Sequence, residues 1–178
     1  MTTLHHLNTL NQDNFVATLG QLFEGPPWIV AQAWHTRPFT SFTHLHQSLC
    51  AIMYNAPIEQ HIALLQTHPD LVGRAALAGT LTPASTSEQA SAGLDRLSAE
   101  EIATFQRLNQ AYRDRFGFPF VICARENKKD SILTGFATRL HNTRQQEIHI
   151  ALGEVAKICF FRLHDLVQPD EVGEGSVC

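Results

Sequence analysis

The chain has 178 residues, of which 44% are hydrophobic and 17% are charged, a globular composition that argues against a disordered protein. Thirteen Lys and Arg against 17 Asp and Glu give a formal net charge of −4, so no basic excess indicates binding to nucleic acid. No stretch approaches 18 consecutive apolar residues, which excludes a membrane span.

The four cysteines are far apart, at Cys50, Cys123, Cys159 and Cys178, and no Cys-x-x-Cys pair occurs. This spacing excludes zinc-ribbon and thioredoxin-like sites. Residues 1–9 have neither a basic region nor an apolar run, so no secretory signal is predicted. We therefore expect free thiols in a reducing compartment, in agreement with a cytoplasmic location.

The first part of the chain shows apolar residues at helical spacing, separated by proline and glycine. Gly25-Pro26-Pro27 ends the first stripe, and Ser41 is a suitable cap for the third helix. The predicted helices cover residues 11–23, 28–36, 42–54 and, from Pro57, a segment through Leu65. Residues 67–84 then contain two glycines, two prolines and no long apolar stripe. Irregular segments on a rigid scaffold commonly carry sites.

Helical signals return in the second part. Two capping boxes are predicted, one from Ser85 to Glu88 and one from Ser98 to Glu101. The second opens a helix to Phe116, ended by Gly117 in a left-handed conformation. Residues 118–122 are expected to be extended or turning, Asp130 to cap a helix to His141, and Thr143 with Gln146 to begin the last and longest helix, to about Val167. The fold prediction is one all-α domain of about eight helices, residues 1–178, with a core over about 11–167 and short tails.

Several kinds of chemistry have no support in the residue spacing. The ten histidines do not pair at the three- or four-residue spacing that helical metal ligands need. No Gly-x-Ser-x-Gly elbow, phosphate-binding glycine loop or dinucleotide motif occurs. His46 and Cys50 are four residues apart, but Cys50 lies near the apolar side of its helix, where cysteine usually serves packing. No metal site is predicted.

Three features remain open between a structural and a functional interpretation. His68 directly precedes Pro69, which favours an extended conformation at the histidine; it is either a helix stop or a side chain projecting from a bend. Ser85 and Glu88 are either cap residues or ligands for an anion at a helix start. Arg162 interrupts an apolar run in the last helix and is either on its solvent face or directed into a pocket.

Five motifs spread over most of the sequence can be compared with known families. They are His68-Pro69-Asp70-Leu71; Leu81-Thr82-x-x-Ser85-x-x-Glu88-Gln89-x-x-x-Gly93-Leu94; Leu108-Asn109-x-x-Tyr112-x-x-x-Phe116-Gly117-Phe118-Pro119-Phe120; Lys129-x-x-Ile132-Leu133; and Glu154-Val155-x-Lys157-Ile158-x-x-x-Arg162-Leu163. Each motif alone is weak, but five in order are specific. On these motifs the sequence, from about residue 15 to 167, resembles the 2-oxo-4-hydroxy-4-carboxy-5-ureidoimidazoline (OHCU) decarboxylases of urate breakdown.

The resemblance implies an all-α carboxy-lyase of purine catabolism that needs no metal or organic cofactor and can form a homodimer. It implies that His68 is the catalytic proton donor and that Glu88 and Arg162 also belong to the catalytic set. The substrate-binding residues that it implies are Pro69 by its backbone, Ser85, Thr86, Ser87, Glu88 and Gln89 at a helix start, and Phe120, Val121, Ile122, Cys123 and Ala124 mainly by their backbone.

The reaction implied is decarboxylation of OHCU to (S)-allantoin, and the only partner expected is this small-molecule substrate, with no nucleic acid and no membrane. Eukaryotic members of the family can carry a peroxisomal tail, and residues 173–178 show no such tripeptide; the resemblance therefore favours a cytoplasmic enzyme. A non-catalytic helical binding or regulatory module, and a metal hydrolase, are the alternatives. Turnover separates the first alternative from the enzyme, and stoichiometric metal after dialysis would indicate the second.

Overall fold

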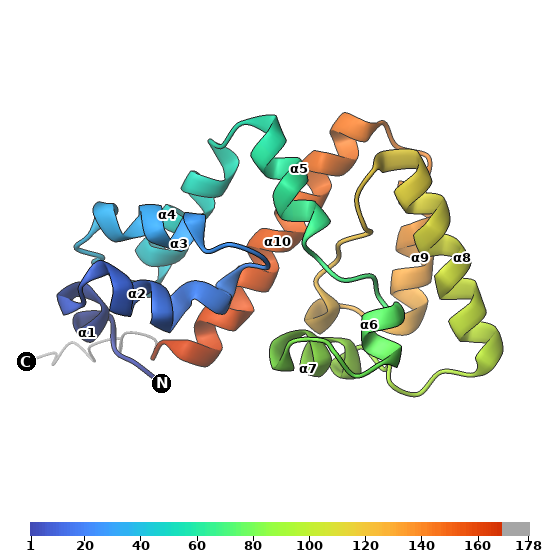
Figure 1. Ribbon diagram of the computed structural model, residues 1–178, viewed down its shortest axis with the longest axis horizontal. Coiled ribbons are helices and arrows are strands. Elements are labelled where there is room, and N and C mark those ends of the chain that lie inside the picture. Colours follow the sequence, from blue (N-terminus) through green and yellow to red (C-terminus); the bar gives the residue numbers. More distant parts are fainter. Residues whose placement is uncertain (169–178) are drawn as a thin grey trace, which may run out of the picture. The chain divides into compact units, whose positions relative to one another are not determined.

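The computed structural model describes residues 1–168 (Figure 1). The regular elements in that range are ten α-helices and three short 3-10 helices, with one isolated bridge between Thr2 and Val167. The predicted all-α class is confirmed. The helix count exceeds the prediction because α1 (Leu4–Thr9) and α6 (Arg74–Leu77) are too short to show an apolar stripe. Across residues 1–168, none of the helices has the length and apolarity needed to cross a bilayer.

The contacts divide the chain into two compact units. The expectation that residues 1–178 form one domain with a core over about 11–167 stays a prediction, and the segment 173–178, with Cys178, lies outside the described residues. Of the described residues, the first unit comprises 1–55 and 159–168, and the second comprises Ala56–Ile158. The last helix, α10 (Arg144–Leu166), contributes to both.

In the first unit, α2 (Gln12–Leu19), α3 (Trp28–Ala33) and α4 (Phe42–Tyr54) pack together, with the 3-10 helices η1 (Gly20–Leu22) and η2 (Trp34–Thr36) between them. The predicted cap is confirmed, since Ser41 Oγ accepts a hydrogen bond of 3.0 Å from the N–H of His44. The buried apolar residues of this unit include Phe15, Leu19, Ile29, Val30, Leu45, Leu49 and Met53. In α2 and α4 these residues recur every four positions, which places one stripe of each of these helices in the core.

The second unit contains α5 (Ile58–Gln66), α6, α7 (Pro83–Ser91), α8 (Ala99–Phe116), η3 (Ala124–Glu126) and α9 (Lys129–Arg139). α8 and α9 lie side by side (Figure 1). The predicted ends of α8 are confirmed: Ser98 and Glu101 form a capping box, and Gly117 ends the helix at a φ of 82°. The core of this unit is aromatic and includes Phe105, Tyr112, Phe116, Phe118, Phe120 and Phe136.

Two predicted helix starts are wrong. α7 begins at Pro83, and its cap is Thr82, whose Oγ1 accepts a hydrogen bond of 3.2 Å from the N–H of Ser85. Proline suits the first helical position because it lacks an N–H that would be unsatisfied there, so Thr82-Pro83 begins the helix before Ser85 can act as its cap. α9 begins at Lys129, which places Asp130 in the first turn rather than at the cap. The predicted start of α10 is confirmed by reciprocal hydrogen bonds of 2.8 and 3.2 Å between Thr143 and Gln146.

Candidate active site

His68 lies just beyond the last turn of α5, and its side chain is buried. Its backbone N–H donates to the carbonyl of Leu65 at 3.2 Å, and its ring Nδ1 lies 3.0 Å from the carbonyl oxygen of Leu64. A carbonyl oxygen can only accept, so Nδ1 is the protonated nitrogen in this contact. Nε2 is therefore the nitrogen that can exchange a proton with a ligand, as an acid–base role requires.

The segment after His68 is fastened to α8 by two polar contacts. The guanidinium Nε of Arg113 bonds both carboxylate oxygens of Asp70, at 2.8 and 3.1 Å. The side-chain amide of Asn109 donates to the carbonyl of Leu71 at 2.7 Å, within the core. The start of the predicted irregular segment is thus held against α8 at Asp70 and Leu71. Neither contact is evident from the sequence. Pro69, the predicted backbone ligand, lies with Asp70 on a surface pocket of about 690 Å³.

The segment also contacts α7 through one hydrogen bond. The side-chain Oε1 of Gln89 accepts from the backbone N–H of Val72 at 3.0 Å, and both residues are buried. Val72 has a φ of 53°, a left-handed conformation that is costly for a β-branched residue. Because Gln89 directly follows Glu88 in α7, this contact ties the chain downstream of His68 to the helix that carries the predicted catalytic carboxylate.

The predicted binding residues of α7 divide between two faces. Ser85, Glu88 and Gln89 are buried, whereas Thr86 and Ser87 are exposed. The spacing of three and four places the first three on one face of the helix. The structure therefore supports Ser85, Glu88 and Gln89 as an inward-facing group and places Thr86 and Ser87 away from it. Thr86 instead donates its hydroxyl to the carbonyl of Thr82 at 3.0 Å.

Glu88 faces η3, which lies against α7. The Nε atom of Arg125 is 4.0 Å from the carboxylate Oε1 of Glu88. The backbone N–H of Lys129 donates to the carbonyl of Ala92 at 3.2 Å, which joins the start of α9 to the end of α7. Arg125 is a charged neighbour of the site that the sequence motifs do not include.

The second predicted binding segment, residues 120–124, leads directly into η3. Phe120, Val121, Cys123 and Ala124 are buried, and Ile122 is half-buried. The ring of Phe120 stacks on that of Phe136 with centroids 3.8 Å apart. A Cβ atom at Gly135 would lie 3.2 Å from the tip of the Phe120 ring, so glycine at this position in α9 gives that ring its space. The contacts of η3 with α7 bring this segment beside the inward-facing group of α7.

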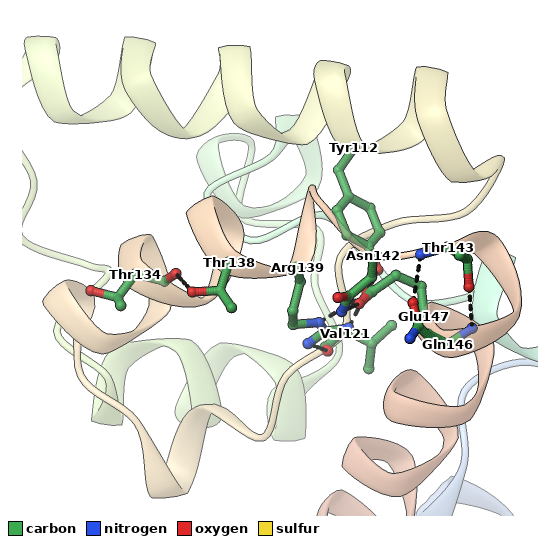
Figure 2. A network of polar contacts seen from close by, with 9 residues as sticks. All are labelled: Tyr112, Val121, Thr134, Thr138, Arg139, Asn142, Thr143, Gln146 and Glu147. Carbon is green, nitrogen blue, oxygen red and sulfur yellow. Dashed lines mark hydrogen bonds and ion pairs between the residues drawn. The ribbon is translucent and has the colours of Figure 1, made fainter.

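The backbone of this segment is held by a buried polar network, which Figure 2 shows. Arg139 donates from Nη1 to the carbonyl of Val121 at 2.8 Å and from Nε to the carboxylate of Glu147 at 2.9 Å. Glu147 also accepts from the hydroxyl of Tyr112 and, at 2.7 Å, from the side-chain amide of Asn142. Burial raises the pKa of Tyr112, so its hydroxyl stays protonated and acts as a donor. Each charge in this network therefore has partners, as buried charges require.

Arg162 lies in the first unit, in the last turns of α10, and is buried. Its Nη2 atom is 2.9 Å from the carboxylate of Glu24, and its Nη1 donates to the carbonyl of Gln21 at 3.3 Å. Its burial excludes the solvent face of the helix, one of the two alternatives that the sequence left open, and the other, a cation directed into a pocket, stays a prediction. Its expected convergence with His68 and Glu88 stays a prediction.

Comparisons with known proteins decide the family. A family model described as OHCU decarboxylase matches residues 8–164. The OHCU decarboxylases of Amia calva and Xenopus laevis are 42% and 39% identical over 93% and 92% of this chain and 94% and 93% of their own lengths. This chain belongs to the OHCU decarboxylase family. Among solved structures, an (S)-allantoin synthase superposes with a TM-score of 0.73 at 25% identity over 94% of this chain, which spans 54% of that longer protein.

Two other kinds of site, a metal site and a reactive thiol, can be compared with the described residues. Within residues 1–168, no three His, Cys, Asp or Glu side chains are grouped so that they could hold a metal ion. The sulfur of Cys50 is 3.4 Å from Nε2 of His46, but burial raises the pKa of that thiol to about 11. Burial also raises the pKa values of Cys123 and Cys159. A thiolate nucleophile at neutral pH is therefore disfavoured at all three described cysteines.

Proposed function

We propose that this protein catalyses the decarboxylation of OHCU to (S)-allantoin in urate catabolism. The observation that carries the proposal is family membership over nearly the whole chain, with relatives named as OHCU decarboxylases at about 40% identity. The likeness to a structure described as an (S)-allantoin synthase supports the handedness of the product.

The substrate supplies its own electron sink. The carboxylate is on a ring carbon next to a carbon–nitrogen double bond. When the carbon–carboxylate bond breaks and CO2 leaves, the electron pair moves toward that nitrogen, which takes up a proton. Return of a proton to one face of the neighbouring carbon, with loss of the hydroxyl proton to form a carbonyl, completes (S)-allantoin. This balance needs no external oxidant or reductant, which supports the expectation of a cofactor-independent enzyme.

In this proposal His68 exchanges a proton with the substrate through Nε2, because Nδ1 is hydrogen-bonded to the carbonyl of Leu64. Ser85 and Glu88, on the inward face of α7, hold the polar atoms of the ring and the ureido group. The backbone of residues 120–124 and of Pro69 completes the binding surface. Arg162 offers a planar, two-pronged donor for a carboxylate or carbonyl oxygen of the substrate. The burial of His68, Ser85, Glu88 and Arg162 supports these roles, since excluding water strengthens polar interactions with a substrate.

The test is turnover of OHCU generated in situ from urate, followed by circular dichroism of the allantoin formed. Because the spontaneous reaction gives racemic allantoin, the enzyme is expected to give both a faster reaction and an excess of the S enantiomer. A non-catalytic helical module would leave rate and racemic outcome unchanged. We also propose a homodimer and a cytoplasmic location, which light scattering on the purified chain and cell fractionation test.

A further inference from the structure

Glu154 belongs to the last of the family motifs, and the proposed mechanism gives it no role. It lies in α10, two turns after Glu147, and its side chain is largely buried, at 15% exposure. Its carboxylate has two partners of different kinds. Oε2 accepts a hydrogen bond of 2.8 Å from the backbone N–H of Cys123, and Oε1 forms an ion pair of 2.9 Å with Lys157.

The contact with Cys123 is one of two anchors on the same short segment. Two residues earlier, the carbonyl of Val121 accepts from Arg139 at 2.8 Å, and Arg139 is in turn held by Glu147 at 2.9 Å. The backbone on both sides of Ile122 is therefore fixed by charged side chains, and α10 supplies the carboxylate for each anchor. A seven-residue spacing places Glu147 and Glu154 on one face of that helix.

This arrangement matters for a segment that binds a ligand through its backbone. The directions of backbone N–H and C=O groups depend on φ and ψ, so they must be set by contacts made elsewhere. We propose that Glu154 is a positioning residue for the decarboxylation, which acts by fixing the peptide groups around Ile122 for substrate. The inference rests on the proposed function, in which residues 120–124 bind the substrate.

Two properties of Glu154 can be separated by substitution. Glu154→Gln keeps an oxygen at the same reach from the backbone but loses the charge that pairs with Lys157. Glu154→Asp keeps the charge but is one methylene shorter, so it withdraws the oxygen from the N–H of Cys123. Lys157→Gln is the matched control, because it removes the ion pair with Glu154, together with a second one to Glu126 at 3.2 Å, and leaves the contact with Cys123 in place.

The experiment measures kcat and KM for each full-length variant with OHCU generated in situ, together with the melting temperature. We expect Glu154→Gln and Lys157→Gln to keep a KM within about twofold of the wild type, since each retains an acceptor for the Cys123 N–H. Glu154→Asp is expected to raise KM by about tenfold, because a buried N–H loses its partner, with a smaller change in kcat. A merely structural role would lower the melting temperature without separating KM from kcat.

The reverse pattern would be a wild-type KM in Glu154→Asp and a raised KM in Glu154→Gln. It would overturn the proposal in favour of a role for the charge. Equal KM values in the two variants, whether both match the wild type or both are raised, would also overturn it. These outcomes are distinct from failure of the proposed function, in which the wild-type protein itself gives no acceleration and no excess of (S)-allantoin.

Discussion

The backbone N–H of Val72 donates to the side-chain oxygen of Gln89 at 3.0 Å, which joins the segment after His68 to the helix that carries Glu88. Val72 is held at a φ of 53°, a conformation that persists only where surrounding contacts impose it. Gln89 is thus a support for the segment after His68, and its role as a substrate ligand, which the family resemblance implied, stays a prediction.

This relationship predicts the effect of Gln89→Met, which keeps the length of the side chain but removes the acceptor. A buried N–H without a partner costs about 1–3 kcal/mol, so the melting temperature should fall. The value of kcat should fall as well, because the segment that orients His68 is released. Gln60→Met, at an exposed position of α5, is the control. An unchanged melting temperature in Gln89→Met would contradict a supporting role.

His68→Asn tests the proton transfer directly. Asparagine retains an N–H that can donate to the carbonyl of Leu64 but has no group that exchanges a proton near neutral pH. We expect a folded protein whose kcat is lower by roughly 10²–10⁴-fold, the usual contribution of general acid–base catalysis. His149→Asn, on the exposed side of α10, should retain wild-type kcat. Near-normal turnover by His68→Asn would remove His68 from the mechanism.

Glu88→Gln separates a catalytic role of the Glu88 charge from a structural role of this side chain in α7. Since α7 is capped by Thr82 and starts at Pro83, Glu88 has no part in the helix cap, and its buried carboxylate lies near Arg125 instead. We expect a fall in kcat of about 100-fold or more with a small change in melting temperature. Thr82→Ala should do the opposite, costing about 1 kcal/mol of stability at nearly constant kcat. Full activity in Glu88→Gln would give Glu88 a structural role only.

The helices were predictable where apolar spacing and a cap agree, as in α4, α8 and α10. The start of α7 was not, because Ser85-x-x-Glu88 fits a capping box as well as Thr82-Pro83 fits a helix start, and sequence spacing does not rank the two. The residues of the candidate site were likewise predictable only in part. Local motifs indicate His68 and Glu88, whereas Asn109, Arg125 and Arg139 act through contacts with residues distant in sequence, which only the folded chain brings together.

Alkylation tests whether a thiol takes part in catalysis. Burial raises the pKa of Cys50 to about 11, so the folded protein holds the proton more tightly than the unfolded chain. The thiolate is then scarce at pH 8, at roughly one molecule in a thousand, and reaction with iodoacetamide should be slow. In urea the three described cysteines should react readily. Rapid inactivation of the native protein by iodoacetamide at pH 8, with the label on Cys50 or Cys159 rather than on Cys123 of the proposed binding segment, would contradict a mechanism without thiols.

Arg162→Lys tests whether the guanidinium of Arg162 binds the substrate in addition to its ion pair with Glu24. Arg162 contacts the carboxylate of Glu24 at 2.9 Å and the carbonyl of Gln21 at 3.3 Å. Lysine keeps the positive charge for the ion pair but loses the planar fork that binds two oxygens at once. We expect a folded protein that binds OHCU more weakly and turns it over more slowly, with kcat/KM lower by about tenfold or more.

Glu24→Gln is the matched control for this prediction, because it weakens the same ion pair from the other side and leaves the guanidinium intact. If Arg162 acts on the substrate, Arg162→Lys should lose much more kcat/KM than Glu24→Gln at a similar melting temperature. If Arg162 serves only the fold, the two variants should lose stability and kcat/KM in parallel, since each disturbs one buried pair. Wild-type kcat/KM in a folded Arg162→Lys protein would exclude Arg162 from the catalytic set.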